Sequence, residues 1–216
     1  YDFRPHPFSP GAHDIWYWSQ SDSDRQRIAG DKWVQFLEGD NPSYPEDELE
    51  RGLNQVRDRM SRMAADDTAP DTRLSDDMNS INPATIEGLV RLMLGGIPVG
   101  RSAHTLHCRL RYFDAETRRA GVPQDVAALV ENMSDDAVTV QLVNLDPVRE
   151  RHVVIQGGAY GEHRMGSVCV EGGEKVDVPG DGSAFTVRLA PGAGSRLTIS
   201  QDRFSRQPTF TFPWDR

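Results

Sequence analysis

The chain has 216 residues, of which 37% are hydrophobic and 26% are charged, and its formal net charge is -9. A chain of this size can bury a core, and its composition is that of a globular protein rather than a disordered or collagen-like one. No apolar run approaches the roughly 18 residues of a membrane-spanning helix, and no long basic stretch is present, so we expect neither a membrane span nor a nucleic-acid partner.

The negative charge is local. Residues 40–80 hold 11 acidic residues against 5 arginines, whereas residues 101–216 hold 15 acidic and 14 basic residues. Arginine outnumbers lysine 22 to 2, which could serve carboxylate or phosphate recognition. Codon bias in a GC-rich genome, such as a bacterial one, is the favoured interpretation.

The chain opens with Tyr1-Asp2-Phe3 and shows neither a Met nor a signal segment at this end. We therefore expect a fragment or subunit that works with a missing N-terminal domain or a partner protein chain. A secreted or periplasmic location is slightly favoured. The two cysteines, Cys108 and Cys169, can form one bridge or stay as buried free thiols.

Residues 1–20 combine aromatic side chains with several prolines, which fix extended backbone and deny it helical hydrogen bonds. We expect an extended aromatic arm that needs a surface to cover its rings. His13, Trp16 and Trp18 are candidate substrate-binding residues, because an imidazole and stacking rings can bind a sugar. Packing of the arm in the core is the favoured alternative.

About three helices are predicted after the arm. The first starts at a serine cap near Ser21 and stops at Gly39. The second opens with Pro45 and an acidic turn, and its apolar residues step by three and four along one face: Leu49, Leu53, Val56, Met60 and Met63. The third starts at Asn82-Pro83 and ends at Gly95-Gly96.

An acidic loop is predicted between the second and third helices, where residues 66–79 have no apolar period. Its carboxylates are of the kind that calcium prefers: Asp66, Asp67, Asp71, Asp76 and Asp77. The spacing lacks the ligand register of an EF-hand, so a solvated acidic turn is favoured over a calcium site.

Beyond Pro98 the apolar period changes from that of helices to that of strands. Nine short strands are predicted, at 104–113, 126–131, 137–145, 152–156, 167–170, 175–178, 184–189, 196–200 and 209–212. We therefore predict an α+β fold, in which an aromatic arm and helical segment (1–97) precede an antiparallel β-sandwich domain (98–216).

Two segments of this second half, Ala137–Asp146 and Phe185–Gly194, resemble the last β-sandwich of many glycan-active enzymes. In such enzymes one strand ends in an Asn-containing turn, a late strand runs into a Pro-Gly turn, and a helical or barrel catalytic domain precedes the sandwich. The resemblance covers about half of the chain and implies a part of a carbohydrate-active hydrolase or lyase. It assigns no catalytic residue.

Residues 157–164 follow an apolar strand and combine three glycines with a phenol, a carboxylate, an imidazole and a guanidinium. These groups make Tyr160, Glu162 and His163 candidate catalytic residues and Arg164 a candidate substrate-binding residue. The favoured alternative is a glycine bulge whose side chains satisfy one another or grip the helical half. Because a glutamate favours a charged imidazole beside it, a site here should titrate near the usual histidine range of roughly 6 to 7.

A zinc site is also considered at His104, His107 and Cys108, because imidazole and thiolate suit that metal. Strand geometry argues against it, since His107 points to the opposite face and about 13 Å of strand separates the other two residues. An ordinary half-buried strand is expected.

Two functions from different classes stay open. The chain is either a C-terminal fragment or subunit of a carbohydrate-active hydrolase or lyase, whose sandwich supports a glycan-binding cleft, or a non-catalytic structural or interaction subunit that docks a larger partner protein. The first predicts a longer gene product with an upstream domain that has its own carboxylate pair, and the second predicts a distinct protein as the neighbouring chain.

Overall fold

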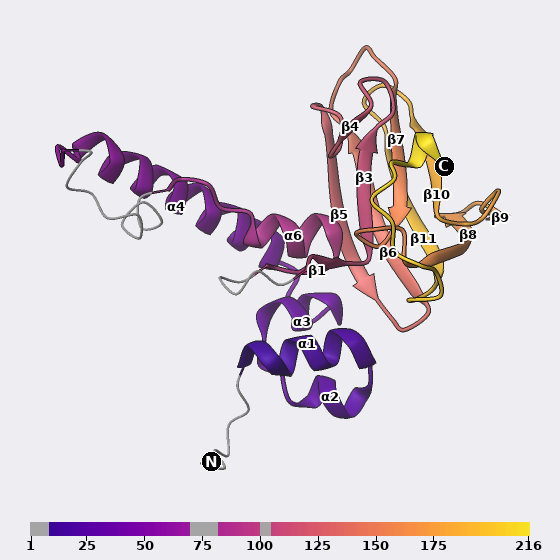
Figure 1. Cartoon of the computed structure of the whole chain (residues 1–216), viewed down its shortest axis with the longest axis horizontal. Helices are drawn as coiled ribbons and strands as arrows, with labels where there is room; N and C mark the ends of the chain where they lie inside the picture. Colours follow the sequence, from indigo (N-terminus) through magenta and orange to yellow (C-terminus); the bar gives the residue numbers. More distant parts are fainter. Residues whose placement is uncertain (1–8, 70–81, 100–104) are drawn as a thin grey trace.

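Helices occupy the N-terminal part of the chain and antiparallel strands the rest in the computed structural model, which describes residues 9–69, 82–99 and 105–216 (Figure 1). The predicted α+β fold is confirmed. The change of structure falls at Gly95, whose left-handed φ of 57° ends the last helix one residue before the first strand. Within the described ranges, no helix has the length and apolar character needed to cross a membrane.

Short polar caps define the small helices. The helices are α1 (Ser9–Ser19), α2 (Asp22–Gln26), α3 (Lys32–Leu37), α4 (Tyr44–Ala65) and α6 (Glu87–Leu94). The Ser21 side chain accepts a hydrogen bond from the Asp24 amide at the start of α2, and Asp31 accepts from two amides at the start of α3. The predicted run from Ser21 to Gly39 is therefore two helices.

The prediction of extended backbone is wrong for residues 9–19, which form α1. Pro10 is the second residue of this helix, where its missing N–H would have no partner inside the helix. No further proline follows before Ser19, so the aromatic residues of this segment lie on a helix. Residues 1–8 of the predicted arm lie outside the described residues.

The long helix α4 runs away from the rest of the molecule (Figure 1). Only Tyr44 and Glu48 are buried among its 22 residues. The shorter α6 packs beside its first half, where a Cβ on Gly88 would lie 2.7 Å from Glu48 Oε1. The third predicted helix begins at Glu87 rather than at Pro83, because residues 82–86 form coil.

Two antiparallel sheets form the β-sandwich, with strand orders β10-β7-β3-β4 and β5-β6-β11-β8-β9, and β1 pairs with β2 beside them. The strands are β1 (Gly96–Ile97), β2 (His107–Cys108), β3 (Leu110–Asp114), β4 (Arg119–Ala120), β5 (Val126–Met133), β6 (Ala137–Asn144), β7 (Arg151–Gly157), β8 (Arg164–Val170), β9 (Lys175–Asp177), β10 (Ala184–Leu189) and β11 (Gly194–Asp202).

One hydrophobic core joins the helices to the sandwich. It runs from Trp16 and Trp33 in the helices through Leu92 of α6 to Val130 and Ile155 of the two sheets. The edge of Trp16 meets the face of Trp33 at 5.8 Å between ring centroids. Segments 1–97 and 98–216 are therefore packed against each other through buried apolar side chains.

Two strand predictions differ from the structure. The predicted strand 104–113 is interrupted at Arg109, whose buried side chain donates hydrogen bonds to the carbonyls of Ser134 and Ala137. The predicted strand 209–212 belongs to no sheet, because prolines flank it and its only backbone hydrogen bond to another segment joins Thr209 to Tyr160 among the described residues.

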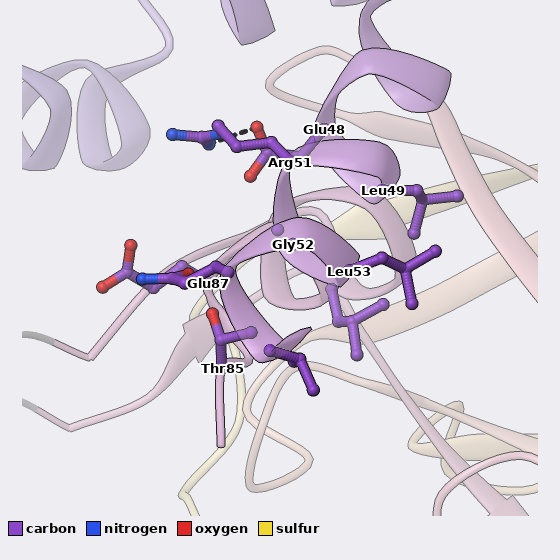
Figure 2. Close-up of a pocket in the computed structure, with 11 residues that line it drawn as sticks. Glu48, Leu49, Arg51, Gly52, Leu53, Thr85 and Glu87 are labelled. Carbon is purple, nitrogen blue, oxygen red and sulfur yellow. Dashed lines mark hydrogen bonds and ion pairs between the residues drawn. The ribbon is translucent and has the colours of Figure 1, made fainter. Parts of the chain in front are cut away.

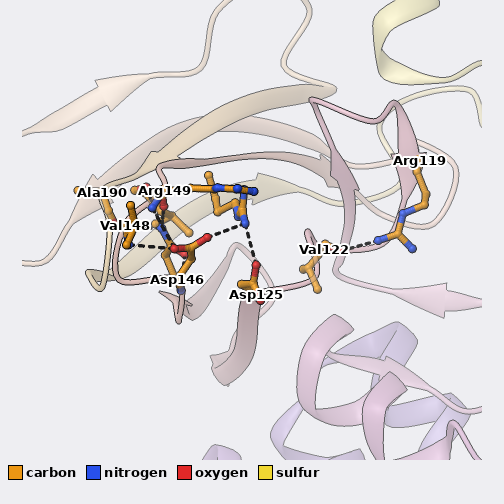
Figure 3. Close-up of polar contacts among 10 residues, drawn as sticks. Arg119, Val122, Asp125, Asp146, Val148, Arg149 and Ala190 are labelled. Atoms are coloured by element: carbon orange, nitrogen blue, oxygen red, sulfur yellow. Dashed lines mark hydrogen bonds and ion pairs between the residues drawn. The ribbon is translucent and has the colours of Figure 1, made fainter.

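The two segments that resemble glycan-active enzymes meet at one end of the sandwich. The Asn144 side chain donates hydrogen bonds to the carbonyls of Leu189 and Ala190, at 3.3 and 3.1 Å. Beside it, Arg151 bridges the carboxylates of Asp125 and Asp146 (Figure 3). The Asn-containing turn thus holds the Pro-Gly turn in place, which is a structural role.

Candidate functional site

A cleft of about 550 Å³ lies where four segments far apart in the sequence meet. The segments are the end of α1, residues 105–107 at β2, the loop between β7 and β8, and the C-terminal stretch after β11. Apolar and aromatic side chains make up most of its lining, and polar groups stand among them. We call it the aromatic cleft, and its lining residues are Trp18, Thr105, His107, Tyr160, Glu162, Phe204, Arg206, Pro208, Thr209 and Phe210.

One wall is a stack of aromatic rings. Trp18 lies nearly parallel to Phe204, with 4.4 Å between centroids and 16° between planes. The ring of His107 meets Trp18 at 4.8 Å and 69°. Arg203 fixes this wall, since it donates hydrogen bonds to the carbonyls of Tyr17 and Trp18 at the end of α1. Trp18 keeps 46% of its surface exposed and offers it to the cleft.

A second aromatic pair is formed by Tyr160 and Phe210, with 5.3 Å between centroids and 72° between planes. The Thr209 amide donates a 2.9 Å hydrogen bond to the Tyr160 carbonyl, so the C-terminal stretch is tied to the loop at this point. Phe210 is 89% exposed. This wall therefore presents apolar surface that no described residue covers.

Glu162 organises the loop from inside. Its carboxylate accepts hydrogen bonds from the amides of Ala159 and Tyr160, at 3.1 and 2.7 Å. Gly158 has a φ of 83°, and a Cβ there would lie 2.4 Å from the Glu162 carboxyl carbon. The glycine therefore lets the carboxylate approach the backbone, and both carboxylate oxygens are engaged.

His163 lies beneath the Trp18–Phe204 wall and is 1% exposed. Its Nδ1 accepts a 3.1 Å hydrogen bond from the Phe204 amide, and its ring meets that of Phe204 at 4.6 Å and 89°. Burial, followed by the charges of Arg109 and Arg203, lowers the pKa of His163 to about 3. The predicted imidazolium titrating near neutral pH is therefore wrong, and His163 supports the cleft as a neutral ring.

Among the described residues, the hydrogen bonds of the loop reach the C-terminal stretch and none reaches the helices. In addition to the contacts of Tyr160 and His163, the Glu162 carbonyl accepts a hydrogen bond from the Arg206 amide. Arg206 in turn pairs with Asp181. These contacts support the glycine-bulge interpretation of residues 157–164, but the loop holds the C-terminal stretch where the interpretation named the helical half.

The other predicted sugar-binding residues lie away from the cleft lining. His13 Nε2 lies 2.9 Å from the Asp31 carboxylate that caps α3, and Trp16 is buried in the core. Arg164 is exposed at the start of β8. Of the predicted substrate-binding and catalytic residues, the cleft brings together Trp18, Tyr160 and Glu162.

The predicted calcium loop is only partly described. Asp66 caps the end of α4, where its side chain accepts a hydrogen bond from the Thr68 amide, and Asp67 follows it. Asp71, Asp76 and Asp77 lie outside the described residues, as does His104. In the parts of the chain that are described, no three His, Cys, Asp or Glu side chains are grouped to hold a metal ion. Cys108 and Cys169 are free thiols.

Sequence reasoning missed Phe204, Arg206 and Phe210. Their only signal in the sequence is the cluster of aromatic residues and prolines at residues 203–214, and of this cluster the apolar alternation predicts only a strand at 209–212. Phe204 stacks on Trp18 and has a positive φ of 55°, a backbone conformation that is uncommon for a phenylalanine and that residue type does not predict.

Comparison with known proteins gives one match, to a family model described as a domain of unknown function (DUF8034) over residues 29–90. This range covers α3, α4 and the first half of α6, and every residue that lines the aromatic cleft lies outside it. No curated protein and no solved structure matches the chain.

Proposed function

We propose that the aromatic cleft binds a glycan and that the chain is the sugar-binding part of a carbohydrate-active hydrolase or lyase. The observation that carries this proposal is the partly exposed Trp18–Phe204 stack facing into a cleft that also holds His107, Arg206 and Thr209. Sugars present apolar C–H faces and polar hydroxyl edges, so they suit a site with aromatic faces and a few hydrogen-bonding groups.

The cleft supports binding better than it supports cleavage. Glycoside hydrolysis commonly uses two carboxyl groups that flank the scissile bond. Glu162 is the one carboxylate among the described lining residues, and the amides of Ala159 and Tyr160 occupy both of its oxygens. A catalytic carboxylate pair is therefore expected from a domain or chain outside these residues.

Titration of the protein with soluble neutral and uronic-acid oligosaccharides, followed by calorimetry and tryptophan fluorescence, tests the proposal. We expect saturable binding by at least one oligosaccharide. Trp18→Ala should weaken it roughly tenfold or more, as for a central aromatic contact. Trp214→Ala is the matched control, since Trp214 stacks on Phe212 outside the cleft lining and its loss should leave affinity unchanged.

A second candidate function is the docking of a larger partner protein through the same aromatic residues. The 89% exposure of Phe210 favours it, because a ring left in water can be covered by a partner. Absence of binding across the whole oligosaccharide panel, or equal losses in Trp18→Ala and Trp214→Ala, would overturn the glycan proposal and leave this alternative.

A further inference from the structure

The apolar face of α4 is exposed along most of the helix. We call it the α4 stripe, and its residues are Leu49, Leu53, Val56, Met60 and Met63. Leu53 is 55% exposed and Met60 52%. In Figure 2, Leu49 and Leu53 project to one side of α4, and Arg51, paired with Glu48, lies on the other.

The exposed stripe suits packing against another element. Most helical stability in proteins comes from packing of an apolar face rather than from helix propensity, and α4 buries only Tyr44 and Glu48. Here α6 and residues 82–86 cover one edge of α4, with Arg59 donating hydrogen bonds to the carbonyls of Asn82 and Ala84. Between α4 and α6 lies a groove of about 450 Å³, which is lined by Leu49, Leu53 and Val56 of the stripe and by the exposed Leu89 of α6.

The spacing of the stripe points to another helix as the covering element. Its residues are separated by four, three, four and three positions, which is the alternation of the two core positions of a heptad repeat. Side chains at this spacing pack knobs into holes against a second helix. The chain itself contains this pattern, so a second copy can supply the partner helix.

The charges of α4 set the direction of such a pair. Its first turns carry the acidic residues Glu46, Asp47, Glu48 and Glu50. Its second half carries Arg57, Arg59 and Arg62 against the single acid Asp58. Two parallel copies would place like charges together, whereas antiparallel copies place the acidic half of each beside the basic half of the other.

We propose that the α4 stripe pairs with the α4 stripe of a second copy, antiparallel, to form a homodimer. In the register that overlays the helices end to end, over about 33 Å, Leu53 lies opposite Val56 and Leu49 opposite Met60 of the second copy. The same register places Glu50 beside Arg57 of the second copy, twice by symmetry. Both residues lie on the edge of the stripe opposite Arg59, away from residues 82–86.

Sedimentation equilibrium over a range of protein concentrations tests the dimer. We expect the mass of two chains for the full chain, and the mass of one chain for Leu53→Glu, which puts two carboxylates into the apolar seam. Val148→Glu is the matched control, because Val148 is 79% exposed on a loop of the sandwich and should leave the dimer intact. Circular dichroism of each variant checks that the fold is kept.

Charge exchange tests the direction and register. Glu50→Arg and Arg57→Glu should each weaken dimerisation roughly tenfold, since each places like charges together at two symmetric points. The double variant should restore the affinity of the unchanged chain, because the pairs are rebuilt with reversed signs. A monomer at every concentration would overturn the dimer, and failure of the double variant to restore it would overturn the antiparallel register.

Discussion

The aromatic cleft and the α4 stripe both present apolar side chains to solvent, but they are built in opposite ways. The cleft joins segments around residues 18, 105–107, 160 and 204–210, and the buried His163 and Glu162 hold the loop and the C-terminal stretch in place. The stripe lies on one helix with only Tyr44 and Glu48 buried. Its side chains follow the helical repeat of α4, and among the described residues α6 and residues 82–86 cover one edge of the helix.

This difference separates two kinds of recognition. Hydrogen bonds of Glu162, His163 and Arg203 tie the parts of the cleft together, an arrangement that would suit the small ring-stacking ligand proposed for it. A stripe of flexible leucine and methionine side chains suits another helix, which can pack along its whole length. Changes beneath the cleft should therefore affect folding, whereas changes on the stripe should affect association alone.

The largest effect is expected for Arg109→Met. Arg109 is fully buried and donates hydrogen bonds to Gln201 and to the carbonyls of Ser134 and Ala137, at 2.7, 2.6 and 2.9 Å. Burial lowers its pKa only to about 10, so it stays a cation at neutral pH. Its removal leaves the buried Gln201 side chain and two partly buried carbonyls without their donor, which should cost about 3 to 5 kcal/mol of unfolding free energy.

Urea denaturation of Arg109→Met and of Arg188→Met measures this contrast. The Arg188 side chain is 72% exposed and pairs with Glu150 at the surface, so its loss should change stability by less than about 1 kcal/mol. Equal losses in the two variants would show that the hydrogen bonds of Arg109 are not what stabilises the sandwich.

A smaller, pH-dependent effect is expected for His163→Gln. The folded pKa of His163 is lowered to about 3, below the roughly 6.5 of an unfolded histidine. Between these two pKa values the unfolded state binds a proton that the folded state does not. The stability that the neutral His163 ring contributes is therefore fully present above pH 6.5 and decreases as the pH falls. Between about pH 6.5 and 4.5 the loss should reach roughly 2 kcal/mol.

Urea denaturation at several pH values compares His163→Gln with His152→Gln, whose histidine is partly exposed beside Glu150. The His163 variant should lose this part of the pH dependence, and the His152 variant should keep it. If the slope between pH 6.5 and 4.5 is unchanged in His163→Gln, the ring is charged in the folded state and could take part in acid–base chemistry after all.

The fold class could be predicted from the sequence because the local spacing of apolar residues distinguishes helices from strands. Gly95 marks the end of α6, and the strands between Val126 and Leu189 show the short-range alternation of apolar residues that is typical of strands. The prolines of residues 1–20 predict extended backbone, but Pro10 is the second residue of α1, a position where a helix tolerates proline. Apolar and polar residues alternate in Thr209–Phe212 as in a strand, but this segment pairs with no strand of the described sheets.

Only some of the residues that line the cleft could be predicted from the sequence. Trp18, Tyr160 and Glu162 stood out by residue type, but their meeting depends on tertiary contacts with Phe204 and the residues that follow it. The α4 stripe shows the converse. The helical spacing of its apolar residues is evident in the sequence. The same spacing is found in a helix face that packs inside its own chain and in one that packs against another chain, and only the fold distinguishes the two cases.

The smallest effect is expected for Leu53→Gln, measured by urea denaturation at low protein concentration. Glutamine forms helices nearly as well as leucine, and Leu53 is 55% exposed, so stability of the single chain should change by less than about 0.5 kcal/mol. Leu37→Gln in α3 is the matched control, because Leu37 is 5% exposed in the core and its loss should cost about 3 kcal/mol. Raising the protein concentration should then separate the unchanged chain from Leu53→Gln, since association stabilises only the chain that dimerises. A large loss in Leu53→Gln at every concentration would mean that the stripe is covered within its own chain, and the contrast between cleft and stripe would fail.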